Sequence, residues 1–230
     1  MFMKGKLSEA RRAFERSLEI YPNFGGAHAG LATIFEAEGR LDEALQAYQT
    51  AIRVDPGYTI RPHFNLGFLY LRMGMTSEAR EEFHRAARRG IYRVSGLNRL
   101  AKGLFLVGSL DEARDALEKA VYYTPDSFAL RNNLGVVYFR QQRWDDAQRE
   151  LEAAFHLKPD LPEVHYHLGM VYEKQGRLLD SQASFETALR LRPQNPAARR
   201  SLGGMLLRQG KAAEANREFT LPDDQEMLLR

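Results

Sequence analysis

The chain contains no cysteine, so disulfide bonds, thiolate nucleophiles and cysteine metal ligands are all excluded. It also lacks a long apolar run, because no uninterrupted stretch approaches the roughly 18 residues that a membrane-spanning helix needs. The opening MFMKGKLSEARRAF has no apolar segment ending in small residues, and we expect no signal peptide there. We therefore expect a soluble protein, with the cytoplasm as its default compartment.

Neither sign of charge dominates the chain. Its 230 residues include 33 basic and 30 acidic side chains, which give a formal net charge of +3. This balance lacks the basic excess typical of proteins that bind nucleic acid through bulk electrostatics. Hydrophobic residues make up 44% of the chain, which is enough apolar material for a packed core.

What the sequence does have is an internal repeat with a period of 34 or 35 residues. Its clearest marker is a leucine followed by glycine or alanine, at Leu31, Leu66, Leu100, Leu134, Leu168 and Leu202. A small residue recurs in the same rhythm at Ala10, Ala44, Ala79, Ala113, Ala147, Ser181 and Ala215. Proline closes most units, at Pro22, Pro56, Pro125, Pro159 and Pro193. A repeat of this length indicates stacked supersecondary units.

Each unit contains two helical patterns separated by a short break. In FALRNNLGVVYFRQQ, one helical face carries Leu130, Leu134, Val137 and Tyr138. In WDDAQRELEAAFHLKP, one face carries Trp144, Ala147, Leu151, Ala154 and Phe155. Gly135 and Ala147 would let the two helices approach closely, and the proline after the second pattern would end that helix. The sequence predicts helix hairpins and no strand.

These residues resemble the tetratricopeptide repeat (TPR) family over nearly the whole chain. Departures are local: Gln142 stands where glycine is usual, Ser181 replaces alanine, Ile91 replaces proline, and one residue is inserted near Thr59. The resemblance implies an all-α solenoid, a right-handed superhelix of tandem hairpins in one domain. The expected boundaries are a half repeat at 1–24, repeats at 25–59, 60–93, 94–127, 128–161 and 162–195, a truncated repeat at 196–221 and a capping tail at 222–230.

No constellation for catalysis or metal binding is found. His28, His63 and His165 share one position in their hairpins, where we expect them to pack against a neighbouring helix. The acidic pairs at Asp111 and Asp145 fall at helix starts, where negative charge complements the helix dipole. We therefore expect no enzyme activity, no cofactor and no bound metal.

The resemblance implies a partner-binding groove, because in the TPR family the first helix of each hairpin lines the concave face. Carried onto this chain, the groove would be lined by Phe64, Asn65, Phe68, Asn98, Arg99, Lys102, Asn132, Asn133, Arg140, Tyr166, His167 and Lys174. Within it, a row at steps of 34 comprises Asn65, Arg99, Asn133 and His167. Asn132 lies one place round. The predicted groove is amide-lined, partly aromatic and net positive.

Such a groove suits a protein partner that presents an extended segment with acidic side chains or a free C-terminus. Amides can bond a peptide backbone without reading its sequence, and cations attract an acidic partner. Asn98, Lys102 and Asn133 give a partial, permuted likeness to the family's carboxylate clamp. Two alternatives stay open: the asparagines are merely tolerated surface residues, or the aromatic and basic groove binds single-stranded nucleic acid.

The two ends of the chain depart from the repeat. The first 24 residues would supply a second helix alone, so that Ala10, Phe14 and Leu18 lack their hairpin partner. This apolar edge would dock a second copy of the chain or an upstream segment, or it simply reflects a shifted start. At the other end, residues 227–229 are expected to fold back as a cap, as terminal repeats require.

Overall fold

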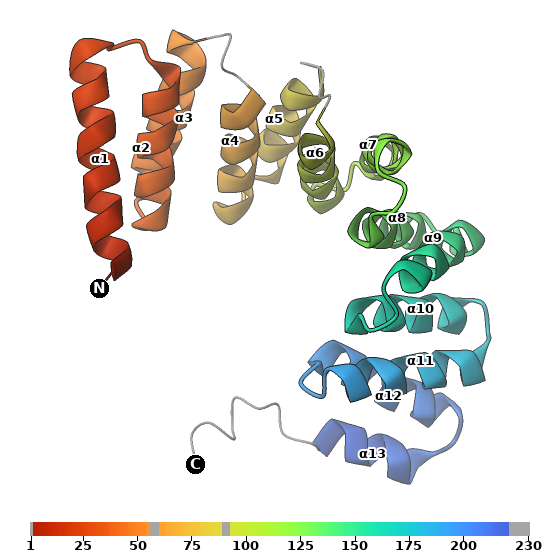
Figure 1. The fold of residues 1–230 in the computed structure, drawn as a ribbon. Coiled ribbons are helices and arrows are strands. Elements are labelled where there is room, and N and C mark those ends of the chain that lie inside the picture. The colour runs from red at the N-terminus through yellow and green to blue at the C-terminus, as the bar shows by residue number, and fades with distance from the viewer. Residues whose placement is uncertain (1, 56–59, 89–92, 221–230) are drawn as a thin grey trace. The chain divides into compact units, whose positions relative to one another are not determined.

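The computed structural model describes residues 2–55, 60–88 and 93–220, and within them every element is an α-helix (Figure 1). The first seven helices are α1 (Phe2–Ile20), α2 (Gly25–Ala37), α3 (Leu41–Val54), α4 (Ile60–Arg72), α5 (Thr76–Arg88), α6 (Val94–Leu106) and α7 (Leu110–Tyr123). The other six are α8 (Phe128–Arg140), α9 (Trp144–Leu157), α10 (Pro162–Lys174), α11 (Leu178–Leu191), α12 (Pro196–Arg208) and α13 (Ala212–Thr220). The all-α prediction is confirmed. Residues 222–230, the expected cap, lie outside the described part.

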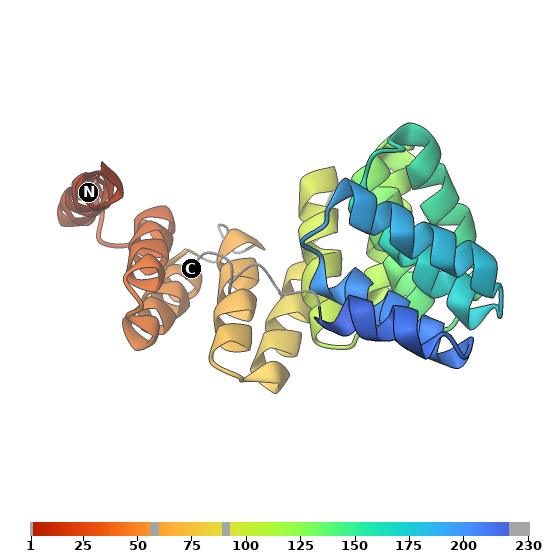
Figure 2. The ribbon, with the colours of Figure 1, turned by 90° about the horizontal axis from the view of Figure 1, so that it is seen from below.

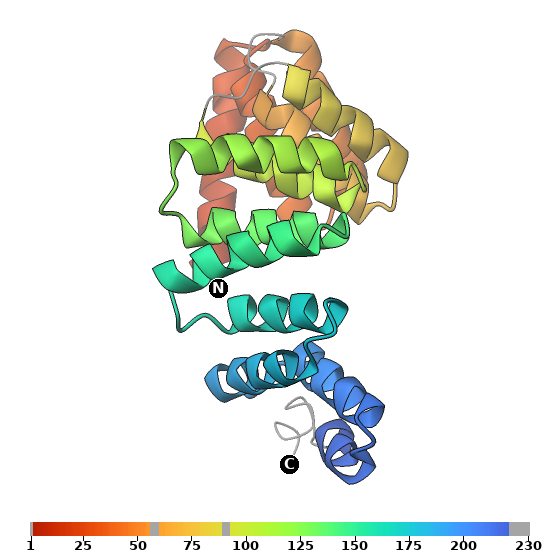
Figure 3. The same ribbon diagram turned by 90° about the vertical axis from the view of Figure 1, so that its right-hand side faces the viewer.

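The helices pair as hairpins. The first helix packs against the second in α2 with α3, α4 with α5, α8 with α9, α10 with α11 and α12 with α13. Figure 2 shows α4 and α5 joined by a short turn, and Figure 3 shows α8 and α9 side by side. By its internal contacts the chain divides into two units, residues 1–116 and 117–230, which are described separately below.

Small residues set the spacing inside each hairpin. The repeating alanines from Ala44 to Ala215 are fully buried, and a Cβ added at Gly135 would lie 2.7 Å from Leu151 Cγ and 3.2 Å from the Ala147 carbonyl oxygen. The predicted close approach of Gly135 and Ala147 is therefore confirmed. Ser181 is also fully buried, and its hydroxyl donates a 2.8 Å hydrogen bond to the Gly169 carbonyl, which satisfies the extra polar group.

The turn within each hairpin needs a residue with positive φ. Glycine supplies it at Gly39, Gly74, Gly108, Gly176 and Gly210, with φ between 76° and 81°. In the α8–α9 turn the same place is taken by Gln142, whose φ is 63°. A side chain in this left-handed region crowds the following carbonyl, so this turn is strained where the others are relaxed.

A hydrogen bond that recurs between hairpins explains the position shared by the histidines. His28 Nε2 donates to the Pro22 carbonyl at 2.9 Å, and His165 Nε2 donates to the Pro159 carbonyl at 2.8 Å. Arg131 and Arg199 stand at the same position and donate to Pro125 and Pro193, each at 2.7 Å. In each case a side chain on the first helix holds the loop six residues back. The expectation of helix packing holds for His63, which is buried, and for His165, whose ring meets that of Phe155 on α9 edge to face at 5.5 Å. His28 and His165 also hold loops.

We expect Ala147→Leu to lower the free energy of unfolding by roughly 1–3 kcal/mol, because the added atoms overpack a fully buried crossing. Chemical denaturation followed by circular dichroism measures the change. Ala183→Leu is the control, since Ala183 is exposed on α11. Equal stability of the two variants would refute the close-packing account.

Gln142→Gly should raise the free energy of unfolding by about 0.5–1 kcal/mol. The substitution relieves the left-handed strain, and the greater conformational entropy of glycine in the unfolded chain offsets part of that gain. The reciprocal variant Gly176→Gln should lose a similar amount. Opposite shifts in the denaturation midpoint are the expected result, and shifts of the same sign would contradict it.

Candidate functional site on the first helices

In unit 1 the predicted groove residues of α4 and α6 form one connected group. Arg99 Nη2 donates a hydrogen bond to Asn65 Oδ1 across the two helices. The Arg99 guanidinium carbon lies 5.6 Å from the ring centre of Phe64 and 5.5 Å from that of Phe68, within cation–π range. Phe68 in turn meets Phe83 edge to face at 5.0 Å. These contacts fix the direction of an arginine side chain that is itself exposed.

Phe64 is a correction to the predicted groove. Its side chain is only 3% exposed, so it belongs to the core beneath Arg99 and cannot touch a partner directly. Its contribution is to support the guanidinium. Asn98 is half-buried, whereas Lys102, one helical turn after Arg99, is exposed and makes no salt bridge to any residue that the structure describes.

Arg99 carries an unusual charge balance. Partial desolvation lowers the pKa of its guanidinium below the usual value, although the group stays charged at neutral pH. No carboxylate lies within salt-bridge distance of it among the described residues. Glu36, which lies beyond salt-bridge distance, offsets the desolvation only in part, and partly dehydrated cations of this kind mark candidate functional sites.

Behind Asn65 lies a polar network that sequence reasoning missed. Tyr48, a core residue of α3, donates to Glu36 Oε2 at 3.2 Å and lies 3.1 Å from the Thr33 hydroxyl oxygen. Burial raises the pKa of Tyr48 to about 12, and the Glu36 carboxylate adds to the shift. Arg72 Nη1 bonds the other oxygen of Glu36 at 2.8 Å, so this basic residue is already neutralised. The spacing of 36 residues between Glu36 and Arg72 was the sequence signal that could have predicted this ion pair.

In unit 2 the pairing differs from the predicted row. His167 Nδ1 donates to Asn132 Oδ1 at 2.8 Å, whereas the sequence aligned His167 with Asn133. Asn133 is half-buried beside this pair. Tyr166 is half-buried against Phe185 at 5.8 Å between ring centres, as part of the α11–α12 core. Asn132 and His167 are thus joined by a hydrogen bond, and the row through Asn133 stays a prediction.

The cations on α8, α10 and α12 fall into two groups. Arg208 Nη2 forms an ion pair with Glu173 of the preceding first helix, as Arg72 does with Glu36 in unit 1. Arg140 and Lys174 are exposed, and Lys174 makes no salt bridge to any residue in the described ranges. We call the solvent-accessible part of this surface the first-helix face. Each unit has its own part of this face: unit 1 carries Asn65, Phe68, Asn98, Arg99 and Lys102, and unit 2 carries Asn132, Asn133, Arg140, Tyr166, His167 and Lys174.

The proposed self-association edge on α1 is largely covered. Ala10, Phe14 and Leu18 are half-buried, and α1 packs against α2, where the Phe14 ring lies so close to Gly30 that a Cβ there would overlap it. These residues contact α2, and self-association through them stays a prediction. They use the first helix of the next hairpin in place of one of their own.

With the geometry in place, comparison with known proteins shows the family. Residues 26–227 match the family described as the cilia and flagella-associated protein 70 C-terminal domain. The chain belongs to this TPR family. That match begins after α1 and includes every residue of the first-helix face.

Curated relatives resemble parts of the chain. The anaphase-promoting complex subunit cut9 of Schizosaccharomyces pombe is 44% identical over 69 residues, 30% of this chain and 10% of cut9. The TPR repeat-containing thioredoxin TTL4 of Arabidopsis thaliana is 36% identical over 80 residues, 35% of this chain and 12% of TTL4. The BBSome complex member BBS4 of Bos taurus is 24% identical over 138 residues, 60% of this chain and 26% of BBS4. This chain therefore covers about a tenth to a quarter of the length of these relatives.

Solved structures confirm the TPR solenoid fold. YrrB, titled a TPR protein with an unusual peptide-binding site, superposes with a TM-score of 0.68 at 20% identity, over 82% of this chain and 97% of YrrB. The Cut9–Hcn1 hetero-tetramer gives a TM-score of 0.64 at 27% identity, over 88% of this chain and 40% of the matched chain.

Two features were also sought across the described residues. No group of three or more histidine, aspartate or glutamate side chains there could hold a metal ion. Within the same ranges no helix combines the length and the apolar character needed to cross a bilayer.

His167 makes the stability of unit 2 depend on pH. Burial lowers its pKa from 6.5 to about 4, although nearby Glu163 opposes the shift. Above pH 6.5 the residue is neutral in both states, so its contribution is fully present. As the pH falls toward 4, only the unfolded chain takes up the proton, and stability should fall by up to about 1.4 kcal/mol per pH unit.

Urea denaturation at pH 7, 6, 5 and 4 tests this expectation. His167→Gln should flatten the slope between pH 6.5 and 4, while His156→Gln, which removes an exposed histidine on α9, should keep it. An unchanged slope in His167→Gln would show that other groups cause the pH dependence.

Proposed function

We propose that this chain is a non-enzymatic scaffold that binds an extended segment of a partner protein along its first-helix face. The TPR fold is typical of protein-interaction scaffolds, and the relative Cut9 is solved in complex with Hcn1. Because fold does not fix function, the proposal depends on the residues of the site. The cytoplasm remains our expected compartment.

One observation carries the chemistry of the partner. Arg99 is exposed, held by Asn65 and by the rings of Phe64 and Phe68, and lacks a carboxylate partner in the described residues. An acidic side chain or a C-terminal carboxylate of the partner would bind the Arg99 guanidinium, because guanidinium groups bind carboxylates in a bidentate manner. Lys102 adds a second cation one turn away. The partner segment that fits therefore carries an acidic side chain at Arg99, or places its C-terminal carboxylate there.

The half-buried amides of unit 2, taken by themselves, also suit an extended segment. Asn133 in unit 2 can donate to a peptide carbonyl and accept from a peptide N–H, so it can hold a backbone without selecting a sequence. Tyr166 offers a partly exposed aromatic edge beside it. These groups suit an extended chain better than a folded surface, since a folded surface hides its backbone.

We expect Arg99→Glu combined with Asn133→Ala to weaken binding of an acidic segment about tenfold or more, since each charge-assisted hydrogen bond contributes about 1.5–3 kcal/mol. Fluorescence anisotropy with a labelled acidic decapeptide, in free-carboxylate and amidated forms, measures the loss. Affinity capture from cell extract with the parent and the double variant then identifies the natural partner.

Two controls make the result specific. Arg16→Glu makes the same change of charge as Arg99→Glu, at an exposed position of α1 outside the first-helix face, and should leave binding intact. Thermal unfolding of the double variant should stay close to that of the parent. Full peptide binding by the double variant refutes the proposal, and tighter retention of single-stranded nucleic acid than of the peptide would favour the rival function.

A further inference from the structure

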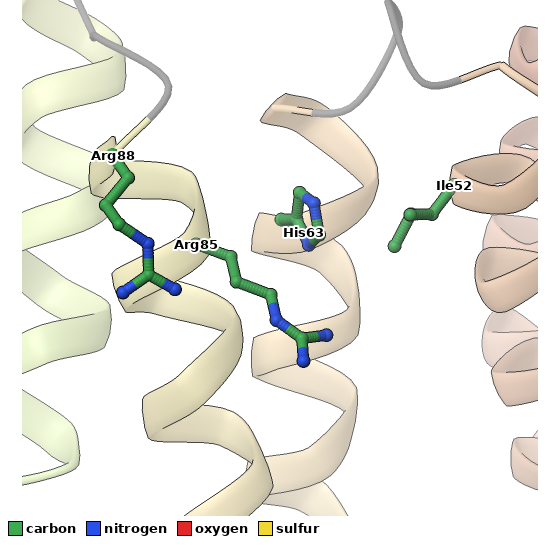
Figure 4. Close-up of a pocket in the computed structure, with 4 residues that line it drawn as sticks. All are labelled: Ile52, His63, Arg85 and Arg88. Carbon is green, nitrogen blue, oxygen red and sulfur yellow. The ribbon is translucent and has the colours of Figure 1, made fainter.

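Unit 1 contains a cavity that shares no residue with the first-helix face. Its volume is about 400 Å³, and its described lining consists of Ile52 on α3, His63 on α4, and Arg85 and Arg88 on α5 (Figure 4). Ile52 and Arg85 reach toward His63 from opposite sides. Three helices from two successive hairpins therefore contribute one apolar and three nitrogen-bearing side chains to the lining.

The repeat pattern shows why this place differs from its equivalents. At the same position in the α8–α9 hairpin, Arg131 reaches both the Pro125 carbonyl and Glu150, at 2.7 and 2.9 Å. His63 bonds only the matching acid, Glu82, through Nδ1 at 2.5 Å. An imidazole is shorter than a guanidinium, and it fills less of the space between the helices.

The acid beside the cavity is already satisfied. Glu82 is 4% exposed, and its two oxygens accept from His63 and from Arg85 Nη1, the latter at 2.8 Å. Arg85 also bonds the exposed carboxylate of Glu81. The burial of the Glu82 carboxylate is tolerated because both of its oxygens are hydrogen-bonded. Arg85, whose side chain is exposed, is held beside the cavity by these two carboxylates.

Arg88 supplies the charge that remains. It is exposed in the last turn of α5, one turn after Arg85, and makes no salt bridge to a residue in the described ranges. No carboxylate is among the described residues that line the cavity. Because Arg85 is paired with Glu81 and Glu82, Arg88 is the unneutralised cation of the described lining, and Ile52 is its apolar side.

We propose that this cavity binds a small organic anion, with its phosphate or carboxylate oxygens on Arg88 and its apolar part against Ile52. Guanidinium groups match both oxyanions in geometry. The volume falls within the range of small-ligand sites, about 300–1,000 Å³, near its lower end. The proposal is independent of partner binding by the first-helix face.

Calorimetric titration with phenyl phosphate and with benzoate, at constant ionic strength, tests the site. Arg88→Gln should weaken binding of the preferred probe about tenfold, and Ile52→Trp should abolish it by filling the cavity without changing charge. Arg190→Gln removes an exposed arginine at the equivalent position of α11 and should bind like the parent. Higher affinity for phenyl phosphate than for benzoate would identify the anionic group of the ligand as a phosphate. Higher affinity for benzoate would identify it as a carboxylate.

Two results would overturn the proposal. One is the absence of saturable binding of either probe below about 10 mM, a weaker affinity than a specific small-ligand site gives. The other is equal weakening by Arg88→Gln and Arg190→Gln, which would mean that the probes respond only to overall charge. Backbone NMR shifts confined to α3, α4 and α5 on addition of the probe would locate the bound anion in the cavity.

Discussion

The close approach of two helix backbones inside each hairpin is the constraint on which the rest depends. A fully buried alanine such as Ala147 faces a glycine such as Gly135, and neither position has room for a larger side chain. Large residues, for example Leu151, then fill the space beside the contact. Because one hairpin cannot bury both of its apolar faces alone, each second helix must also pack on the next first helix. The remaining first-helix positions are therefore free to carry polar side chains.

Polar bonds fix the register of that stacking. Tyr138 donates to Glu118 on the preceding second helix at 2.6 Å, and Tyr172 donates to Glu152 at 3.3 Å one repeat later. Burial and the facing carboxylate raise the pKa of Tyr138, so its phenol stays a donor. Apolar packing alone tolerates sliding, whereas a buried hydroxyl must meet its acceptor. The loop bonds from His28 and Arg131 act in the same way at the other end of the helices.

The sequence predicted the hairpins well because their signals are periodic. Leucine, alanine and proline recur at fixed steps, and each has one structural reason to be there. It predicted the candidate site less well, because a period of 34 aligns positions without fixing side-chain direction. His167 aligns with Asn133 but bonds Asn132, and Phe64 aligns with Tyr166 but is buried. Such outcomes depend on a rotation of a few tens of degrees between neighbouring helices, which depends on packing around the whole contact.

A count of charged residues has the same limit, because it does not show which cations are neutralised. The structure does show this. Counting basic residues treats Arg72, Arg208 and Arg99 alike, yet the first two are neutralised by Glu36 and Glu173 of the preceding first helix. Surface pairs of this kind contribute little stability and leave little charge for a partner. Arg99 instead is held by an amide and two rings, which orient a guanidinium without neutralising it. Arg88 likewise makes no salt bridge within the described ranges, next to a Glu82 carboxylate that is already hydrogen-bonded. In a repeat protein of nearly balanced charge, the cations that are positioned but not neutralised are therefore the ones to connect with ligands.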